Sequence, residues 1–185
     1  MPANEPNAPS DVDEPLAMRW TLGRVLALMV ALATIVFWGW IFSGGPKSTN
    51  PDRLDDRAYV TFAQQRCVQL NGDLAALPNA ITAETATDRA NVLDDANELV
   101  SAMVDDLEAR APTEGDDGTS MRGWIADWRT YVADREDYAD RLREDPDALM
   151  QITENTELHD GVDKTIEIFA DVNDMPECAT PGDVG

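Results

Sequence analysis

The segment TATDRANVLDDANELVSAMVDDL, residues 85–107, decides the fold. Seven of its positions follow one another at alternating steps of four and three, and all but one are apolar: Ala86, Ala90, Leu93, Asn97, Val100, Val104 and Leu107. This register predicts an amphipathic helix with one buried face. Thr85, followed three residues later by Asp88, resembles a capping box and predicts where the helix begins. Asn97 either fixes the register through a buried hydrogen bond or faces the edge of the stripe.

More helical segments are expected toward the C-terminus. Residues 112–120 are rich in Gly and Asp, which predicts an exposed loop, and the next helix is expected at about 121–143. A short fourth segment should open at Asp145 and Pro146, an N-cap followed by proline at the first helical position. The last helix should begin near Asp160 and bury one apolar face, which consists of Val162, Ile166, Phe169 and Val172.

Toward the N-terminus, a first bundle helix is expected at about 54–71. Five side chains recur there at steps of three and four: Val60, Ala63, Cys67, Leu70 and Leu74. No segment has a pattern typical of a strand. The sequence therefore predicts an all-α fold, with an antiparallel bundle of about four helices over residues 54–178 and a C-terminal tail at 179–185.

An N-terminal helix is expected to cross a membrane. The eighteen residues from Val25 to Phe42 carry no charge, and as a helix they would span about 27 Å, close to the thickness of the hydrocarbon core. Tryptophan and phenylalanine flank the span, as interfacial residues do. We therefore expect residues 19–42 to form the transmembrane signal-anchor of a single-pass membrane protein, contacting lipid through 22–42. A cleavable signal peptide is the rival interpretation, but this apolar run is longer than such peptides have, and no Ala-x-Ala site follows it.

Two short segments flank the anchor. Residues 1–18 contain four prolines, four acidic residues and no basic residue, which predicts a disordered acidic tail. Residues 43–53 contain two glycines and two prolines, which predicts a flexible linker between the anchor and the domain.

The orientation of the anchor depends on conflicting signals. Basic residues near the span are Arg19 and Arg24 before it and Lys47, Arg53 and Arg57 after it. This count taken alone places the domain inside, but a long trailing domain translocates largely regardless of such charges. Cys67 and Cys178 stand near the two ends of the domain, which suits a disulfide in an oxidising compartment. We therefore expect this disulfide and an extracytoplasmic domain at the cell membrane, with two buried free thiols as the alternative.

The chain is strongly acidic, which limits its partners. It has 14 Lys and Arg against 36 Asp and Glu, and a net charge of −22. Such a field repels phosphate backbones, so nucleic acid is not expected as a partner. It attracts cations or a basic protein surface, although a solvated exterior that keeps the domain soluble is the simpler interpretation. Weak divalent cation binding is the most we expect at the acid-rich stretches Asp94–Asp95, Asp105–Glu108 and Asp134–Asp147.

No catalytic or cofactor motif rises above background. The chain has no Gly-rich phosphate loop, no Cys-x-x-Cys pair and no EF-hand loop. Its single histidine, His159, precedes Asp163 by four residues, but two ligands in an acid-rich segment are weak evidence for a metal site. We expect no enzyme, no cofactor and no dedicated metal site.

One face of the expected helix at 121–143 is dominated by rings. Its members are Trp124, Trp128, Tyr131, Arg135 and Tyr138. They predict either a core packed with large rings, in which the arginine pairs with a carboxylate or stacks on a ring, or a groove that holds a ligand or a partner's side chain.

The anchor, the missing catalytic set and the acidic exterior together favour one function. We expect a membrane-anchored, non-catalytic interaction or accessory module, which presents an extracytoplasmic acidic helical bundle to a protein partner in an envelope or membrane complex. The alternative is an extracytoplasmic ligand- or cation-sensing domain with a pocket beside the aromatic helix at 121–143.

Overall fold

A computed structural model describes residues 21–42 and 50–183 of the chain. It divides into two compact units, Met1–Ser48 and Thr49–Gly185, which are considered separately below. The predicted disordered tail at 1–18 lies outside the described residues, and so does most of the predicted linker.

The described part of the first unit is the helix α1, Leu22–Phe42. This helix is long and apolar enough to span a membrane, and all of its side chains are exposed. Its 21 residues extend about 32 Å at 1.5 Å per residue. The hydroxyl of Thr34 donates to the carbonyl of Val30 at 2.8 Å, so this polar side chain is satisfied within the helix.

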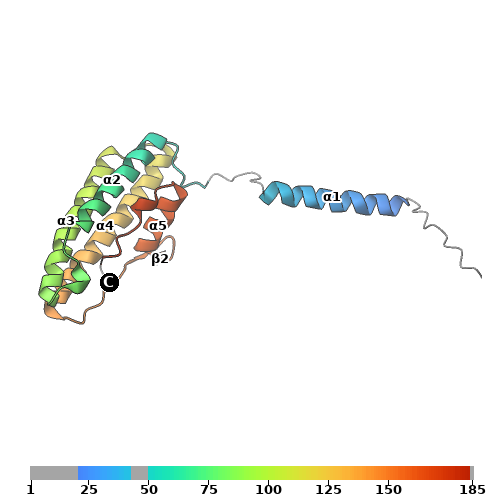
Figure 1. Ribbon diagram of the computed structural model, residues 1–185. Coiled ribbons are helices and arrows are strands. Elements are labelled where there is room, and N and C mark those ends of the chain that lie inside the picture. Colours follow the sequence, from blue (N-terminus) through green and yellow to red (C-terminus); the bar gives the residue numbers. More distant parts are fainter. Residues whose placement is uncertain (1–20, 43–49, 184–185) are drawn as a thin grey trace, which may run out of the picture. The chain divides into compact units, whose positions relative to one another are not determined.

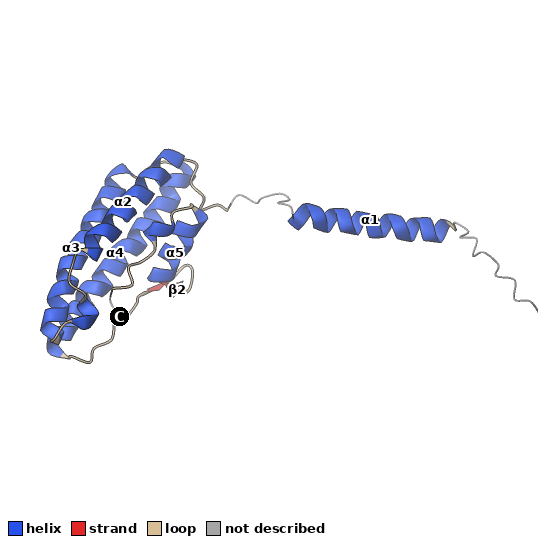
Figure 2. Cartoon of the chain, in the orientation of Figure 1, coloured by secondary structure: helices blue, strands red, loops and turns tan. Residues whose placement is uncertain are grey.

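The second unit is a bundle of antiparallel helices, which confirms the all-α prediction (Figures 1 and 2). Its α-helices are α2 (Arg57–Ala75), α3 (Ala86–Arg110), α4 (Gly115–Glu144) and α5 (Val162–Val172). The short elements are η1 (Ala80–Thr82), η2 (Pro176–Cys178) and the two-residue strands β1 (Glu154–Asn155) and β2 (Asp160–Gly161), which pair antiparallel. The long helices α3 and α4 pack against each other along most of their lengths, while α2 packs on α3 and α5 on α4.

The predicted apolar stripes form the core of this bundle. The larger of two buried clusters contains side chains from all four helices and the cystine: Leu54, Tyr59, Val60, Ala63, Cys67, Leu70, Val100, Met103, Val104, Leu107, Met121, Trp124, Ile125, Trp128, Tyr131, Val132, Val162, Ile166, Phe169, Ala170, Met175 and Cys178. A smaller cluster of α3, α4 and η1 residues lies at the other end of these helices, and the half-buried Met150 packs against both clusters. Each stripe is therefore buried by a neighbouring helix, as an amphipathic face requires.

Helix α3 begins as predicted. The hydroxyl of Thr85 accepts a hydrogen bond from the backbone N–H of Asp88 at 3.0 Å, and the same hydroxyl donates to the Asp88 carboxylate at 2.7 Å. Asn97 is buried, and its side chain bonds to the neighbouring helix α4. The buried hydrogen bond, rather than the edge position, is therefore the arrangement found.

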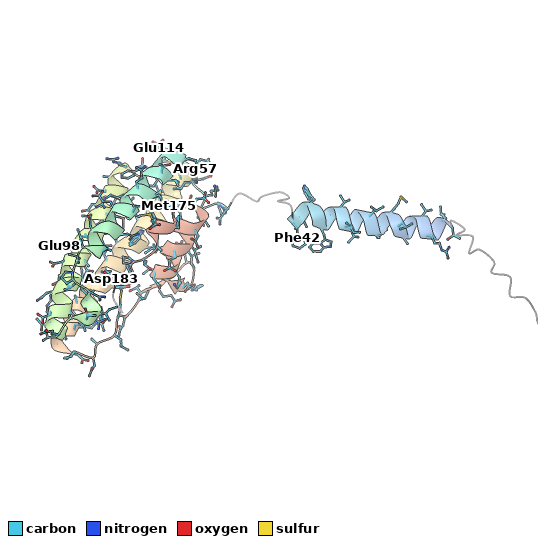
Figure 3. The ribbon with its side chains drawn as sticks, in the orientation of Figure 1. Phe42, Arg57, Glu98, Glu114, Met175 and Asp183 are labelled. Atoms are coloured by element: carbon cyan, nitrogen blue, oxygen red, sulfur yellow. A yellow bond between two sulfur atoms is a disulfide. The ribbon has the colours of Figure 1, made fainter. Side chains whose placement is uncertain are left out.

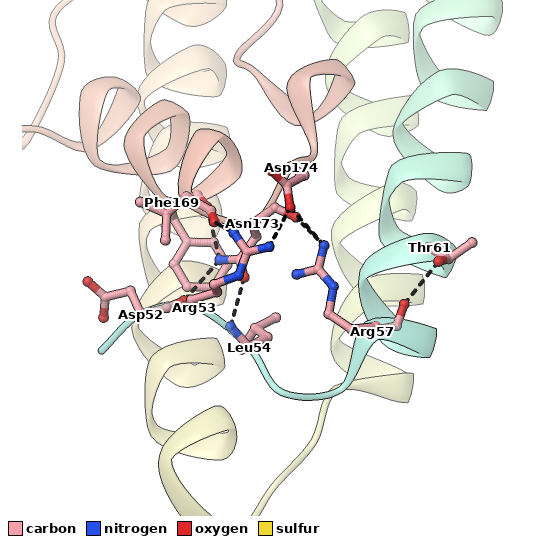
Figure 4. A network of polar contacts seen from close by, with 9 residues as sticks. Asp52, Arg53, Leu54, Arg57, Thr61, Phe169, Asn173 and Asp174 are labelled. Atoms are coloured by element: carbon pink, nitrogen blue, oxygen red, sulfur yellow. Dashed lines mark hydrogen bonds and ion pairs between the residues drawn. The ribbon is translucent and has the colours of Figure 1, made fainter. Parts of the chain in front are cut away.

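The residues that precede α2 are held against the end of α5 (Figure 4). Buried Asn173 donates to the carbonyl of Asp52 at 2.9 Å and accepts from the backbone N–H of Leu54 at 2.8 Å. Arg53 and Arg57 both reach the carboxylate of Asp174, at 2.8 and 3.0 Å. The domain therefore begins before residue 54, and the last residues of the predicted linker are fixed to it.

Two helix predictions were wrong. Helix α4 begins at Gly115, within the segment expected to be a loop, because this first residue adopts a positive φ of 66° and two aspartates favour the first helical turn. Gly118 permits the close approach of this turn to Thr113, since a Cβ at residue 118 would lie 2.4 Å from the Thr113 carbonyl carbon.

The predicted fourth segment is not helical. The side chain of Asp145 accepts from the backbone N–H of Asp147 at 3.0 Å, which forms a turn instead of an N-cap. The loop then returns along α4, where the backbone N–H and hydroxyl of Thr153 each donate to Asp134 at 2.7 Å.

The disulfide prediction is confirmed. Cys67 and Cys178 are bonded, with their Cα atoms 5.1 Å apart. The bridge joins α2 to η2, and the residues after it continue across α4 as far as Asp183. The packed domain therefore includes part of the segment expected to be a tail.

Tyr59 gives the domain a testable dependence on pH. Its hydroxyl donates to the carbonyl of Leu107 at 3.1 Å, and burial raises the pKa of the phenol. Burial also raises the pKa of Tyr131. Because the folded pKa values exceed the unfolded ones, their contribution to stability is complete below about pH 10 and is lost as the pH rises further. We expect the free energy of unfolding, measured by denaturant titration, to fall between pH 10 and 11 by up to about 1.4 kcal/mol per group.

The variant Tyr59→Phe is the control for this prediction. It removes one of the two phenols whose pKa burial raises, so its alkaline loss of stability should be smaller than that of the unmodified chain. Parallel loss in both proteins would contradict the role given to Tyr59.

Candidate functional site

The aromatic face of α4 lies in the core of the bundle. Its residues are at most 3 % exposed: Trp124, Trp128, Tyr131, Arg135 and Tyr138. The Trp124 ring stacks on Phe169 of α5 at a centroid distance of 5.0 Å, and its Nε1 donates to the carbonyl of Ile166 at 3.3 Å. A cleft of about 300 Å³ lies beside the first half of α4, but its lining includes none of these five residues. This burial favours the core interpretation of the five residues over the groove.

Arg135 is the polar centre of this face. Its guanidinium is fully buried, and its Nη1 and Nη2 donate to the two carboxylate oxygens of Asp183 at 2.6 and 2.8 Å. Its Nε donates to Oδ1 of Asn97 on α3 at 2.7 Å, and its Cζ lies 5.7 Å from the ring centroid of Tyr131. Both partners expected for a core arginine, a carboxylate and a ring, are therefore present.

The electrostatics of Arg135 depend on Asp183. Burial by itself lowers the pKa of the guanidinium, but the hydrogen bonds and the charge of Asp183 outweigh burial and raise it. A buried cation of this kind requires a paired and hydrogen-bonded anion. The C-terminal segment supplies that anion from a position 48 residues away in the sequence.

The outer side of the α3–α4 pair carries the candidate site, a cleft of about 490 Å³. We call it the acidic cleft, and its lining residues are Asp94, Asn97, Glu98, Ser101, Ala102, Asp105 and Glu136. All but Glu136 come from one face of α3, and Glu98 marks the position of the cleft on that helix in Figure 3. Four of the seven lining side chains are carboxylates, and the three on α3 recur at helical spacing.

The carboxylates at the two ends of the acidic cleft pair with arginines of α4. At one end, Arg143 pairs with Asp94. At the other end, Arg129 pairs with Asp105 at 2.6 Å, and its bonds to Glu108 and Asp105 raise the pKa of its guanidinium. Arg143 also pairs with Asp140 at 3.0 Å, so each end of the cleft has one arginine that two carboxylates share.

The middle of the acidic cleft is different. Glu98 and Glu136 are exposed and have no ion-pair partner among the described residues. Asn97 lies at the same level, and its Nδ2 is buried without a hydrogen-bond partner. A buried donor left without an acceptor costs about 1–3 kcal/mol. The middle of the cleft therefore holds two free carboxylates beside a donor that lacks its acceptor.

This arrangement suits the binding of a positively charged group. The cleft contains no histidine, cysteine or lysine. Within residues 21–42 and 50–183, no group of three or more His, Cys, Asp or Glu is placed to hold a metal ion. His159, the weak metal candidate, is in a turn with its side chain 81 % exposed, 3.7 Å from the carboxylate of Glu154.

The sequence contained a partial signal for the acidic cleft. Asp94 and Asp105 belong to the acid-rich stretches noted in the sequence, and Glu98 follows Asp94 by four residues. Glu136 could not be assigned to the same place, because its position opposite Asn97 depends on how α3 and α4 pack.

Comparisons with known proteins give no match. No family model matches the sequence, no curated protein matches it, and no solved structure matches it.

Proposed function

We propose that the chain is a membrane-anchored, non-catalytic interaction module, which presents its acidic helical bundle on the extracytoplasmic side to a protein partner in an envelope or membrane complex. The observation that carries this proposal is the acidic cleft, because its free carboxylates can bind a positively charged surface.

The anchor and the cystine support the location. Helix α1 has the length and composition of a membrane span, and the Cys67–Cys178 bridge is typical of an oxidising compartment. An anchor without a cleavage site leaves the domain tethered, so its partner should be found at the same membrane. The alternative is a ligand- or cation-sensing domain with a pocket beside the helix at 121–143, and the burial of the rings on that helix makes it the less favoured of the two.

Sidedness is tested with introduced cysteines and a membrane-impermeant maleimide. Ala109→Cys places a thiol at an exposed position of α3, and Ser10→Cys places one before the anchor. In intact cells we expect Ala109→Cys to be labelled and Ser10→Cys to be labelled only after lysis. The reverse pattern would place the domain in the cytoplasm.

The interaction itself is tested by cross-linking in membranes followed by purification of the full chain in a gentle detergent. We expect one reproducible protein partner, retained when Asp73 and Glu84, which lie away from the cleft, are changed to lysine. The matched variant Glu98→Lys with Glu136→Lys should lose this partner. If the unmodified chain captures no partner reproducibly, the proposed function is wrong.

A further inference from the structure

The charge pattern of the acidic cleft points to a single positive group. Arg143 and Arg129 already pair with the carboxylates at its two ends, so a ligand with several evenly spaced cations would meet arginines there. Glu98 and Glu136 remain unneutralised at the level of Asn97. One cation placed between these two carboxylates would complete the pattern of charges along the cleft.

The amide of Asn97 adds a second requirement. The Nε of Arg135 can only donate, so the atom that faces it at 2.7 Å must be Oδ1 of Asn97. The remaining atom, Nδ2, is therefore the unpartnered donor, and Asn97, a lining residue of the cleft, is only 3 % exposed. A bound metal ion would leave this donor unmatched, because a cation accepts no hydrogen bond. The ligand should carry an acceptor close to its positive charge.

The length of the cleft sets the size of the ligand. Asp94 and Asp105 are eleven residues apart on α3, which corresponds to about 17 Å along the helix axis. An extended peptide covers this distance with about five residues. The main-chain carbonyl of such a peptide lies within a few ångströms of its side chains, so one residue can supply both the cation and the acceptor.

We propose that the middle of the acidic cleft binds one lysine or arginine side chain of an extended segment of the partner protein, with Glu98 and Glu136 holding its charge and Asn97 donating to its main-chain carbonyl. The flanking residues of this segment need no charge, since the carboxylates at both ends of the cleft already have an arginine of α4 as their ion-pair partner. This inference rests on the proposed function and assigns its binding surface.

The test measures binding of the peptide acetyl-Ala-Ala-Arg-Ala-Ala-amide to the full chain in nanodiscs of zwitterionic lipid, by surface plasmon resonance with empty nanodiscs as reference. The same peptide with norleucine in place of arginine tests the need for charge, and N-methylguanidinium tests the need for the carbonyl. We expect the arginine peptide to bind at least about tenfold more tightly than either of these probes. Equal binding of N-methylguanidinium would overturn the assignment of a peptide segment.

Matched variants separate the site from the general field of the acidic chain. The double variant Glu98→Gln with Glu136→Gln should lower the affinity for the arginine peptide at least about tenfold. The double variant Asp73→Asn with Glu84→Asn changes the net charge equally, but its affinity for the peptide should stay within about twofold of that of the unmodified chain. Equal weakening by the two pairs would overturn the inference. If the cleft variants leave the affinity for the arginine peptide unchanged while cross-linking still captures a partner, the inference fails and the proposed function stands. If no partner is captured either, both fail.

Discussion

Loss of the Cys67–Cys178 disulfide is expected to lower the free energy of unfolding of the domain by about 4 kcal/mol. The two cysteines are 111 residues apart, and in the chain-entropy model a loop of about 100 residues contributes about 4.7 kcal/mol by restricting the unfolded chain. Because domains are stable by only about 5–15 kcal/mol, this loss is a large fraction of the total.

The measurement is a denaturant titration of the full chain in a mild detergent. Unfolding is monitored by the change in tryptophan fluorescence as the buried Trp124 and Trp128 become exposed. The midpoint should fall on addition of a reductant, and the double variant Cys67→Ala with Cys178→Ala should show a similar loss. The reductant should have no effect on the double variant, since the chain contains only these two cysteines. An unchanged midpoint for the reduced, unmodified chain would show that the bridge does not stabilise the fold.

The amphipathic helices could be predicted from the sequence because their signal is local. The stripe at 85–107 fixed both the start of α3 and its buried face, and α2 follows the expected register of Val60, Ala63 and Cys67. The boundaries were less predictable where they depend on tertiary contacts. Helix α4 extends back to Gly115 because Gly118 fits against Thr113, and this fit has no counterpart in a periodic pattern.

The candidate site was only partly predictable for the same reason. The face with the largest side chains, on α4, was an obvious candidate for binding, but rings at helical spacing are the residues that a core uses, and these are buried. The acidic cleft combines Asp94, Asn97 and Glu98 of one helix with Glu136 of another. Their proximity follows from the register of α3 and α4, which the bond between Asn97 and Arg135 fixes.

The second large effect is expected at Asp183. Changing Asp183 to Asn leaves the fully buried guanidinium of Arg135 without its carboxylate, and breaking a buried ion pair from one side costs about 3–5 kcal/mol. The side chain of Asp183 is itself 29 % exposed, so water can partly replace it, and we expect a loss of about 3 kcal/mol. The same fluorescence-detected titration measures it.

A matched control exists in Asp174, whose carboxylate contacts two arginines, Arg53 and Arg57, but is exposed (Figure 4). Asp174→Asn should cost no more than about 1 kcal/mol, since exposed ion pairs contribute little and asparagine also tolerates the positive φ of 62° found there. Similar losses for Asp183→Asn and Asp174→Asn would contradict the importance of burial. The double change Asp183→Asn with Arg135→Met should recover most of the loss, because it removes the buried charge together with its partner.

The two effects should also depend on each other. The disulfide fixes Cys178, and Asp183 lies only five residues beyond it, so the bridge keeps the carboxylate close to Arg135. In the reduced chain the C-terminal segment is free to leave, and Asp183→Asn should then cost less than in the oxidised chain. A double-mutant cycle over reduction and Asp183→Asn should therefore give a coupling of at least about 0.5 kcal/mol. If the losses from reduction and from Asp183→Asn are strictly additive, the C-terminal segment stays bound to Arg135 even without the disulfide.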